Sequence, residues 1–329
     1  MIRPARSFCP NCQNSIPWYE NIPILSWLLL RGRCSRCHVR ISSRYVIVEM
    51  VTAILFATAA YLIPFPTFLS LWVILSILVV ITFIDLEFFI IPDTMSKGGI
   101  AAGLLLSFLT PGIHQTTSPL VSVLLSLVGA FAGALILFLI SEFGKLAFGR
   151  YKVTLETPAK FNFDRLPPDD WQILIEDEPF LWSEHFFRKS DRILVHANEV
   201  EINQAVYQNI DLTFFHDRLV TDRETLPLEK IVRLSGRIVS AQFPREAMGL
   251  GDVKLIAAIG AFGGWQGVLF TIAAASFLGA AFGMTAIALG KRERSARIPF
   301  GPYLAIAAVI WFFWGDSVVW WYQATLLRL

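Results

Sequence analysis

Long apolar stretches are the feature that most limits how this chain can fold. Five segments of about 20 residues are nearly free of charged side chains: 45–63, 66–84, 119–140, 266–289 and 299–322. Such lengths match the hydrocarbon core of a bilayer. Two shorter apolar segments, 97–109 and 253–265, would have to be surrounded by protein. With 55% hydrophobic and 16% charged residues, the composition excludes an ordinary soluble protein. The sequence therefore predicts a polytopic α-helical membrane protein with about seven spans.

Basic residues outside these segments predict the orientation. Seven arginines and one acid precede Val46, and the short loop 291–297 holds four basic residues and one acid. An excess of positive charge marks the cytoplasmic side. Six predicted spans separate these two regions, so the charges and the span count agree. We expect the N-terminal segment and the loop 85–96 in the cytoplasm, with 64–66 and 110–118 on the outer side.

The chain between residues 142 and 247 has a different composition. It holds 18 of the 26 acidic side chains and 14 of the 28 basic ones, a net charge of −4, whereas the remainder carries +6. Residues that favour strands cluster at 192–196, 199–202 and 211–215 between turn-forming residues. A short helix is possible at 226–234. We expect a β-rich domain inserted on the cytoplasmic side.

All four cysteines lie near the N-terminus, as Cys9, Cys12, Cys34 and Cys37 in two CxxC pairs separated by 21 residues. A tetrahedral zinc site needs four thiolates at roughly 2.3 Å from the metal, and each CxxC turn supplies two. Disulfides and a redox pair are the alternatives, but disulfides are disfavoured in reducing cytoplasm. The neighbouring His38 is an alternative ligand. Four thiolates leave no open position, so the predicted zinc is structural.

Only eight acids lie outside the predicted insertion: Glu20, Glu49, Asp85, Glu87, Asp93, Asp252, Glu293 and Asp316. Asp85 ends a long apolar run, and Asp252 follows Gly249-Leu-Gly251 and begins another. The predicted topology puts both acids at the cytoplasmic membrane edge, where an ionisable group is costly unless it is paired or used. We therefore consider these two aspartates the candidate functional acids.

Two neighbouring carboxylates in a partly desolvated site share one proton, which is the chemistry of an aspartic protease. Gly249 and Gly251 allow positive φ and a close approach of a substrate backbone. Simpler interpretations remain: Asp252 as a helix N-cap, Asp85 as a helix boundary, and GxGD as a short pattern that arises by chance.

Three other charged residues are expected near the membrane edges. Asp93 and Lys254 each have two interpretations, and Asp316 has a structural one. Asp93 is expected in a turn or at a helix start, with a supporting role near Asp85 as the alternative. Lys254 either tunes the charge of Asp252 or is an ordinary surface lysine whose stem lies along the membrane. Asp316 is expected to mark a loop or a helix interruption near the outer face.

The chain resembles the bacterial prepilin peptidases, the type IV prepilin leader peptidase family of GxGD intramembrane aspartic proteases. The resemblance covers about 220 residues in order and rests on the segments 7–12, 19–34, 41–45 with Glu49, 83–93, 248–255, 263–265 and 298–302. It implies that Asp85 and Asp252 are catalytic and that the four cysteines form a cytoplasmic zinc-binding loop. The expected organisation is a zinc-binding segment 1–44, membrane helices 45–141, the acidic insertion 142–247 and membrane helices 248–329.

The resemblance also implies a function. Members cleave the basic leader of type IV prepilins or type II secretion pseudopilins at the cytoplasmic face of the bacterial cytoplasmic (inner) membrane. Many also methylate the new N-terminus with S-adenosylmethionine. The family normally has a further apolar helix before the zinc loop, whereas Met1 here precedes Cys9 by eight residues. A misassigned start or a lost helix would explain this difference, and it weakens the expectation of methyl transfer.

Other functions remain as alternatives. They are a GxGD protease with other membrane substrates, a non-catalytic membrane scaffold or sensor, and a transporter, whose acids should lie nearer the membrane midplane. The insertion 142–247 is expected to bind the substrate leader or a pilus-assembly protein, or to be a tolerated loop. The expected partners are thus a pilin precursor and the lipid bilayer, and nucleic acid is not among them.

Overall fold

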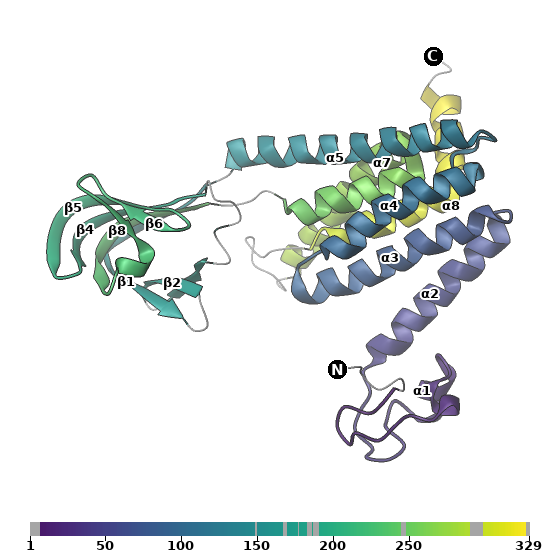
Figure 1. Ribbon diagram of the computed structural model, residues 1–329, viewed down its shortest axis with the longest axis horizontal. Coiled ribbons are helices and arrows are strands. Elements are labelled where there is room, and N and C mark those ends of the chain that lie inside the picture. The colour runs from purple at the N-terminus through teal and green to yellow at the C-terminus, as the bar shows by residue number, and fades with distance from the viewer. Residues whose placement is uncertain are drawn as a thin grey trace. The chain divides into compact units, whose positions relative to one another are not determined.

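The protein divides into two compact units, one helical and one built on a β-sheet (Figure 1). The helical unit comprises Met1–Leu137 and Leu250–Leu329, and the sheet unit comprises Phe138–Gly249. The computed structural model describes residues 7–148, 150–166, 170–176, 178–182, 186, 191–244, 248–289 and 299–326. The basic loop 291–297 of the topology prediction therefore lies outside the described residues.

Within the described residues, five helices are long and apolar enough to cross a bilayer. They are α2 (Ser43–Leu62), α3 (Thr67–Phe88), α5 (Pro119–Phe148), α7 (Leu250–Ala288) and α8 (Gly301–Leu326). Helix α4 (Asp93–Leu109) contains the predicted segment 97–109 and has 17 residues. In Figure 1, α3, α4 and α7 lie side by side. Several membrane-capable helices are thus confirmed, and the five do not by themselves confirm seven spans.

Helix α7 consists of two helical arms joined at Gly264, whose φ of 67° and ψ of −179° are not helical. This backbone conformation is open almost only to glycine. The first arm begins next to the N-terminus of α8, because Gly251 and Gly301 both pack against Ile91. The arm ends beside Trp311, further along α8.

The second arm of α7 returns along α8 in the opposite direction. Phe270 packs on Trp311 with ring centroids 5.5 Å apart, and Phe282 packs on Tyr303 at 5.9 Å. Rising residue numbers in this arm match falling numbers in α8, so the two are antiparallel. The 39 residues of α7 therefore form a helical hairpin and not a single rod of about 58 Å. The sequence predicted two segments here, and Gly264 lies at their boundary.

Glycines allow α5 and α7 to pack with their backbones in contact. A Cβ atom added to Gly129 would collide with the carbonyl oxygen of Gly260, and one added to Gly260 would collide with that of Gly129. One turn further along α5, Gly133 lies in the same way against the carbonyl of Ile256. Small residues at such contacts are typical of membrane helices, since close packing and not the hydrophobic effect drives their association.

The described residues of the sheet unit form eight strands, all paired antiparallel, in the order β3-β2-β1-β8-β4-β5-β6-β7. Their bounds are β1 Arg150–Leu166, β2 Asp170–Ile175, β3 Glu178–Leu181, β4 Ile193–Ile202, β5 Ala205–Phe214, β6 Arg218–Val220, β7 Thr225–Pro227 and β8 Leu234–Pro244. Alternate residues of β4 face a core that includes the buried rings of Phe161, Phe214 and Phe243. The predicted β-rich domain is confirmed, and the short helix is the 3-10 turn η3 (Leu228–Lys230).

The remaining short elements lie in the helical unit. They are η1 (Trp18–Asn21) and α1 (Leu25–Leu29) in the N-terminal segment, and η2 (Pro111–His114) after α4. The expectation for Asp316 was wrong, because this residue lies inside α8 and not in a loop. The preceding Gly315 is buried against the ring of Trp311 one turn earlier, so this glycine serves packing and does not interrupt the helix.

Candidate active site and metal centre

Asp85 lies in the last turn of α3 and is only 5% exposed. Its Oδ2 atom accepts a hydrogen bond of 3.0 Å from the backbone N–H of Gly301, the first residue of α8. A helix N-terminus offers unpaired N–H groups and partial positive charge, which suit a carboxylate. A Cβ atom at Gly301 would lie 2.6 Å from this oxygen, so the contact requires glycine.

Asp252 is the third residue of α7 and is partly buried. The preceding Gly251 packs so closely on Ile91 that an added Cβ atom would lie 2.9 Å from the Cβ of Ile91. A Cβ atom at Gly301 would lie 3.4 Å from the Cδ1 of the same isoleucine. Ile91 therefore lies between the segment that holds Asp85 and the segment that carries Asp252, and the two predicted acids belong to converging segments.

The glycines of the GxGD segment do not use the predicted backbone freedom. Among the glycines that the structure describes, only Gly32 and Gly264 have a positive φ, so Gly249 and Gly251 have ordinary values. Gly251 is instead needed because the side chain of Ile91 occupies the space of a Cβ atom. The absence of a side chain serves helix packing beside Asp252.

Asp93 is the first residue of α4, and its carboxylate contacts two lysines. Lys97, one turn later, lies at 2.7 Å, and Lys254 of α7 contacts the other carboxylate oxygen. Asp93 therefore begins a helix, as expected, and also joins α4 to the start of α7. The ion-pair partner found for Lys254 is Asp93.

Arg44 and Glu87 also belong to this end of the bundle, although no role was predicted for either. The Arg44 guanidinium contacts the Glu87 carboxylate and the backbone carbonyl of Phe83, and it lies 5.4 Å from the centre of the Phe83 ring. These contacts join the start of α2 to the last turns of α3, which carry Asp85. The scarcity of acids outside the insertion was the signal that could have identified Glu87.

The four cysteines converge as a tetrahedral metal site requires. Their Sγ atoms all lie within 4.8 Å of one another, and those of Cys9 and Cys37 are 3.8 Å apart. Four sulfurs at 2.3 Å from one zinc ion would be about 3.8 Å apart. Each pair lies in a similar turn, closed by a backbone hydrogen bond from Gln13 to Cys9 and from His38 to Cys34. The residues present thus fit a metal ion.

The electrostatics of the cluster also suit metal binding. Hydrogen bonds, first from the Asn11 side chain and then from the backbone of Val39, lower the pKa of Cys37 to about 6. The thiolate, which is the metal-binding form, is therefore favoured at neutral pH. The structure brings together the four cysteines and does not include His38 in the group.

Comparison with known proteins identifies the family. Residues 1–63 match the bacterial peptidase A24 N-terminal domain, and residues 72–157 and 231–284 match the type IV leader peptidase family. A prepilin leader peptidase/N-methyltransferase of Aeromonas salmonicida (strain A449) is 30% identical over 323 residues, which are 98% of this chain and 76% of the relative. This chain belongs to the type IV leader peptidase family.

Other members of the leader peptidase family are similar over different lengths. The Stutzerimonas stutzeri prepilin leader peptidase/N-methyltransferase is 28% identical over 313 residues, 95% of this chain and 73% of its own. The Myxococcus xanthus (strain DK1622) protein of the same name is 44% identical over 109 residues, 33% of this chain and 32% of its own. No solved structure matches this chain.

The family match follows the architecture of the chain. Asp85 and Asp252 both lie within the peptidase match, and the four cysteines lie within the N-terminal match. The gap between the matched segments, 158–230, contains the strands from β2 to β7. Most of the sheet unit therefore lies outside the part of the chain that the family model matches.

Proposed function

We propose that this chain is a prepilin leader peptidase with Asp85 and Asp252 as its catalytic pair. It would remove the basic leader of type IV prepilins or type II secretion pseudopilins. The observation that carries this proposal is the buried Asp85, held by the N-terminus of α8 beside the segment that carries Asp252. Family membership and relatives named prepilin leader peptidases support the same function.

The proposed chemistry is that of an aspartic protease. The ionised carboxylate takes a proton from a water molecule as the water attacks the peptide carbonyl. The protonated carboxyl donates to the developing oxyanion and later to the leaving amine. The N–H of Gly301 orients the Asp85 carboxylate through Oδ2. Because such a pair titrates as a unit, no separate protonation state is assigned to Asp85 or Asp252.

The end of the bundle with the acids is proposed to face the cytoplasm of a bacterium. Arg44, Lys97 and Lys254 lie at this end, which agrees with the positive-inside rule. With α4 and the two arms of α7 counted separately, the helices would give the seven spans that the sequence predicts. The cleavage site would then lie at the cytoplasmic face of the inner membrane.

The proposed domain boundaries follow from this topology. The zinc-binding segment comprises residues 1–44, and the two sets of membrane helices comprise 45–141 and 248–329. The β-rich insertion comprises 142–247, and its net charge of −4 would attract the basic leader of a substrate. Binding of a pilus-assembly protein is the other use proposed for this insertion. The relatives' names also suggest methylation of the new N-terminus with S-adenosylmethionine as a second activity.

The experiment that tests the catalytic pair is a cleavage assay in membranes with a prepilin substrate. Asp85→Ala and Asp252→Ala should each lower cleavage at least a thousandfold, because neither carboxylate alone can supply both proton transfers. Ser276→Ala is the matched control, since this exposed hydroxyl bonds only to its own helix at Ile272. Full processing by either aspartate variant would refute the assignment.

Zinc is proposed to hold the N-terminal segment together and to take no part in cleavage. Cys34→Ser should lower the zinc content of the purified protein from one equivalent to well below half, because three thiolates bind more weakly than four. His38→Asn should keep the metal, since asparagine tolerates the positive φ of 55° found there. Elemental analysis of both variants measures their zinc content and so decides which residues bind the metal. Full zinc content in Cys34→Ser would contradict the assignment of the four cysteines as ligands.

A further inference from the structure

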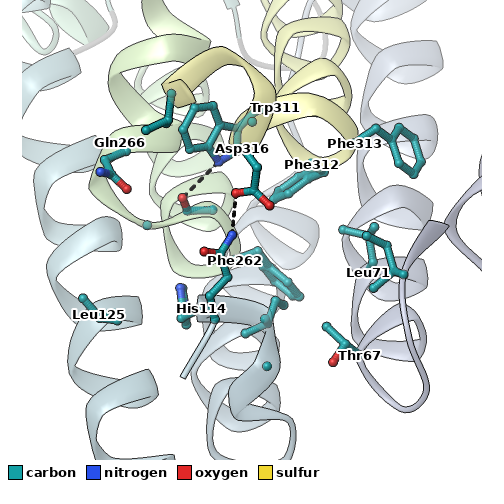
Figure 2. A pocket seen from close by; sticks show the side chains of 18 of the residues that line it. Thr67, Leu71, His114, Leu125, Phe262, Gln266, Trp311, Phe312, Phe313 and Asp316 are labelled. Atoms are coloured by element: carbon teal, nitrogen blue, oxygen red, sulfur yellow. Dashed lines mark hydrogen bonds between the residues drawn. The ribbon is translucent and has the colours of Figure 1, made fainter. Parts of the chain in front are cut away.

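A second site lies far from Asp85 and Asp252, in a cavity of about 790 Å³ within the helical unit (Figure 2). It is bounded by the end of α2, the start of α3, η2, the first turns of α5, the bend of α7 and the second half of α8. Thr67 lines the cavity, and Asp85 follows 18 residues later on the same helix, which corresponds to about 27 Å. The cavity is therefore separate from the proposed active site.

The part of the lining that the structure describes carries one charged side chain, Asp316 of α8. Gln115 donates a hydrogen bond from its side-chain amide to the Asp316 carboxylate (Figure 2). Among the described residues that line the cavity there is no lysine or arginine. A negative charge without a cationic neighbour in the lining favours a positively charged ligand.

His114 of η2 supplies a second acceptor. Its Nε2 lies 3.2 Å from the carbonyl oxygen of Ala261, which can only accept, so Nε2 carries the proton. The same N–H faces the Ser107 hydroxyl, whose own proton goes to the carbonyl of Gly103. Burial lowers the pKa of His114, so the ring is neutral and Nδ1 keeps its lone pair. Nδ1 faces the bend of α7 at Gly264.

Aromatic rings form much of the remaining lining. Trp311 and Phe312 of α8 lie near Asp316 in Figure 2. The lining also includes the rings of Phe262, Trp265, Phe313 and Trp320. The faces of such rings attract cations, tryptophan most strongly. Tryptophans also gather where membrane helices meet the lipid head groups, which is where the ends of α2 and α3 would lie.

Other ligand classes fit this lining poorly. An anion would meet the Asp316 carboxylate with no compensating positive charge. A calcium or magnesium ion requires about six oxygen ligands, whereas the described residues of the lining offer a single carboxylate. The combination of acceptors and aromatic rings instead suits an ammonium group attached to an apolar body.

We propose that this cavity binds a ligand with an ammonium group, with Asp316 and the Nδ1 of His114 as acceptors and the tryptophans as its apolar walls. The ligand would be the head group of an amine-bearing lipid or a soluble amine. This binding site goes beyond the proposed peptidase function. It needs neither catalytic aspartate, so it can be tested in a variant that does not cleave.

Native mass spectrometry of the full chain tests the proposal with two lipids that have the same acyl chains, phosphatidylethanolamine and phosphatidylglycerol. The wild type should retain phosphatidylethanolamine at least fivefold more than phosphatidylglycerol. Asp316→Asn should lose this preference, and Asp316→Glu should keep it because the charge remains. Asp217→Asn, an equal change of charge at an exposed site of the sheet unit, is the control.

A competition arm distinguishes the two sources of the amine. If millimolar ethanolamine alone binds and displaces the lipid, the site takes soluble amines; if it does not, the site requires the lipid. Binding of ethanolamine and binding of the lipid alone both support an ammonium site, provided that Asp316→Asn abolishes the binding. Equal retention of the two lipids by the wild type without ethanolamine binding, or retention unchanged in Asp316→Asn, would overturn the proposal.

Discussion

The two ends of the helical bundle are built from the same helices and differ in chemistry. At one end, Asp85 and Asp93 lie near basic side chains and helix N-termini. At the other end, a single carboxylate, Asp316, lies among aromatic rings and amides. One end therefore suits proton transfer and hydrolysis, and the other suits retention of an amphiphilic molecule. If both proposals hold, one membrane scaffold carries two sites with independent chemistry.

Among the substitutions of glycine, the largest effect is expected from a methyl group at the acidic end. In Gly301→Ala, the added carbon would lie 2.6 Å from Oδ2 of Asp85, so the carboxylate or the start of α8 must move. A misplacement of about 1 Å near a reacting group costs on the order of 100-fold in rate. We expect a loss of about that size in prepilin cleavage, with the protein still folded.

Gly279→Ala is the matched control for this substitution. An added methyl group there would lie 3.6 Å from the ring of Tyr303, which is an ordinary contact. Cleavage by this variant should stay within about twofold of the wild type, because nothing must move. If Gly301→Ala cleaves as fast as Gly279→Ala, the contact with Asp85 does not position the carboxylate.

A change of intermediate size is expected at the other end, where Gly264 joins the arms of α7. Its φ is 67° and its ψ is −179°. Any residue other than glycine pays about 1–3 kcal/mol to adopt this conformation. Gly264→Ala should therefore lower the stability of the bundle by about that amount, measured as a lower midpoint of thermal unfolding. Because the bend also lines the cavity, ammonium binding should weaken.

Gly98→Ala is the counterpart to Gly264→Ala. Gly98 lies within α4, and a methyl group added there would meet no atom within 4 Å. Alanine is the better helix former by about 1 kcal/mol, so this variant should be slightly more stable than the wild type. If both alanine variants raise the midpoint of thermal unfolding, a side chain at residue 264 causes no strain and the backbone of the bend does not require glycine.

The sequence predicted features that depend on neighbours along the chain. The apolar runs of α2, α3, α5 and α8, the strands β4 and β5 and the two cysteine turns are all local patterns. The bond from Gly301 to Asp85 joins residues 216 positions apart, and no periodicity predicts such a pair. The cavity was missed for the same reason, because the described residues of its lining come from six separate elements. Asp316 was expected to mark a loop or a helix interruption because it lies between Gly315 and Ser317.

A small effect is expected for Lys254→Met, and its size decides between the two interpretations of this residue. The ion pair with Asp93 is half exposed, and such pairs contribute at most about 1 kcal/mol. Asp93 also keeps Lys97 as a partner in Lys254→Met. Cleavage should therefore fall less than about fivefold, and added salt should shrink the difference from the wild type.

Lys97→Met, which removes the other partner without breaking the link between α4 and α7, should have a still smaller effect. A loss in Lys254→Met as large as that of the Asp252 variant would mean that this lysine acts on the catalytic carboxylate, and the acidic end would then depend on a third charged group.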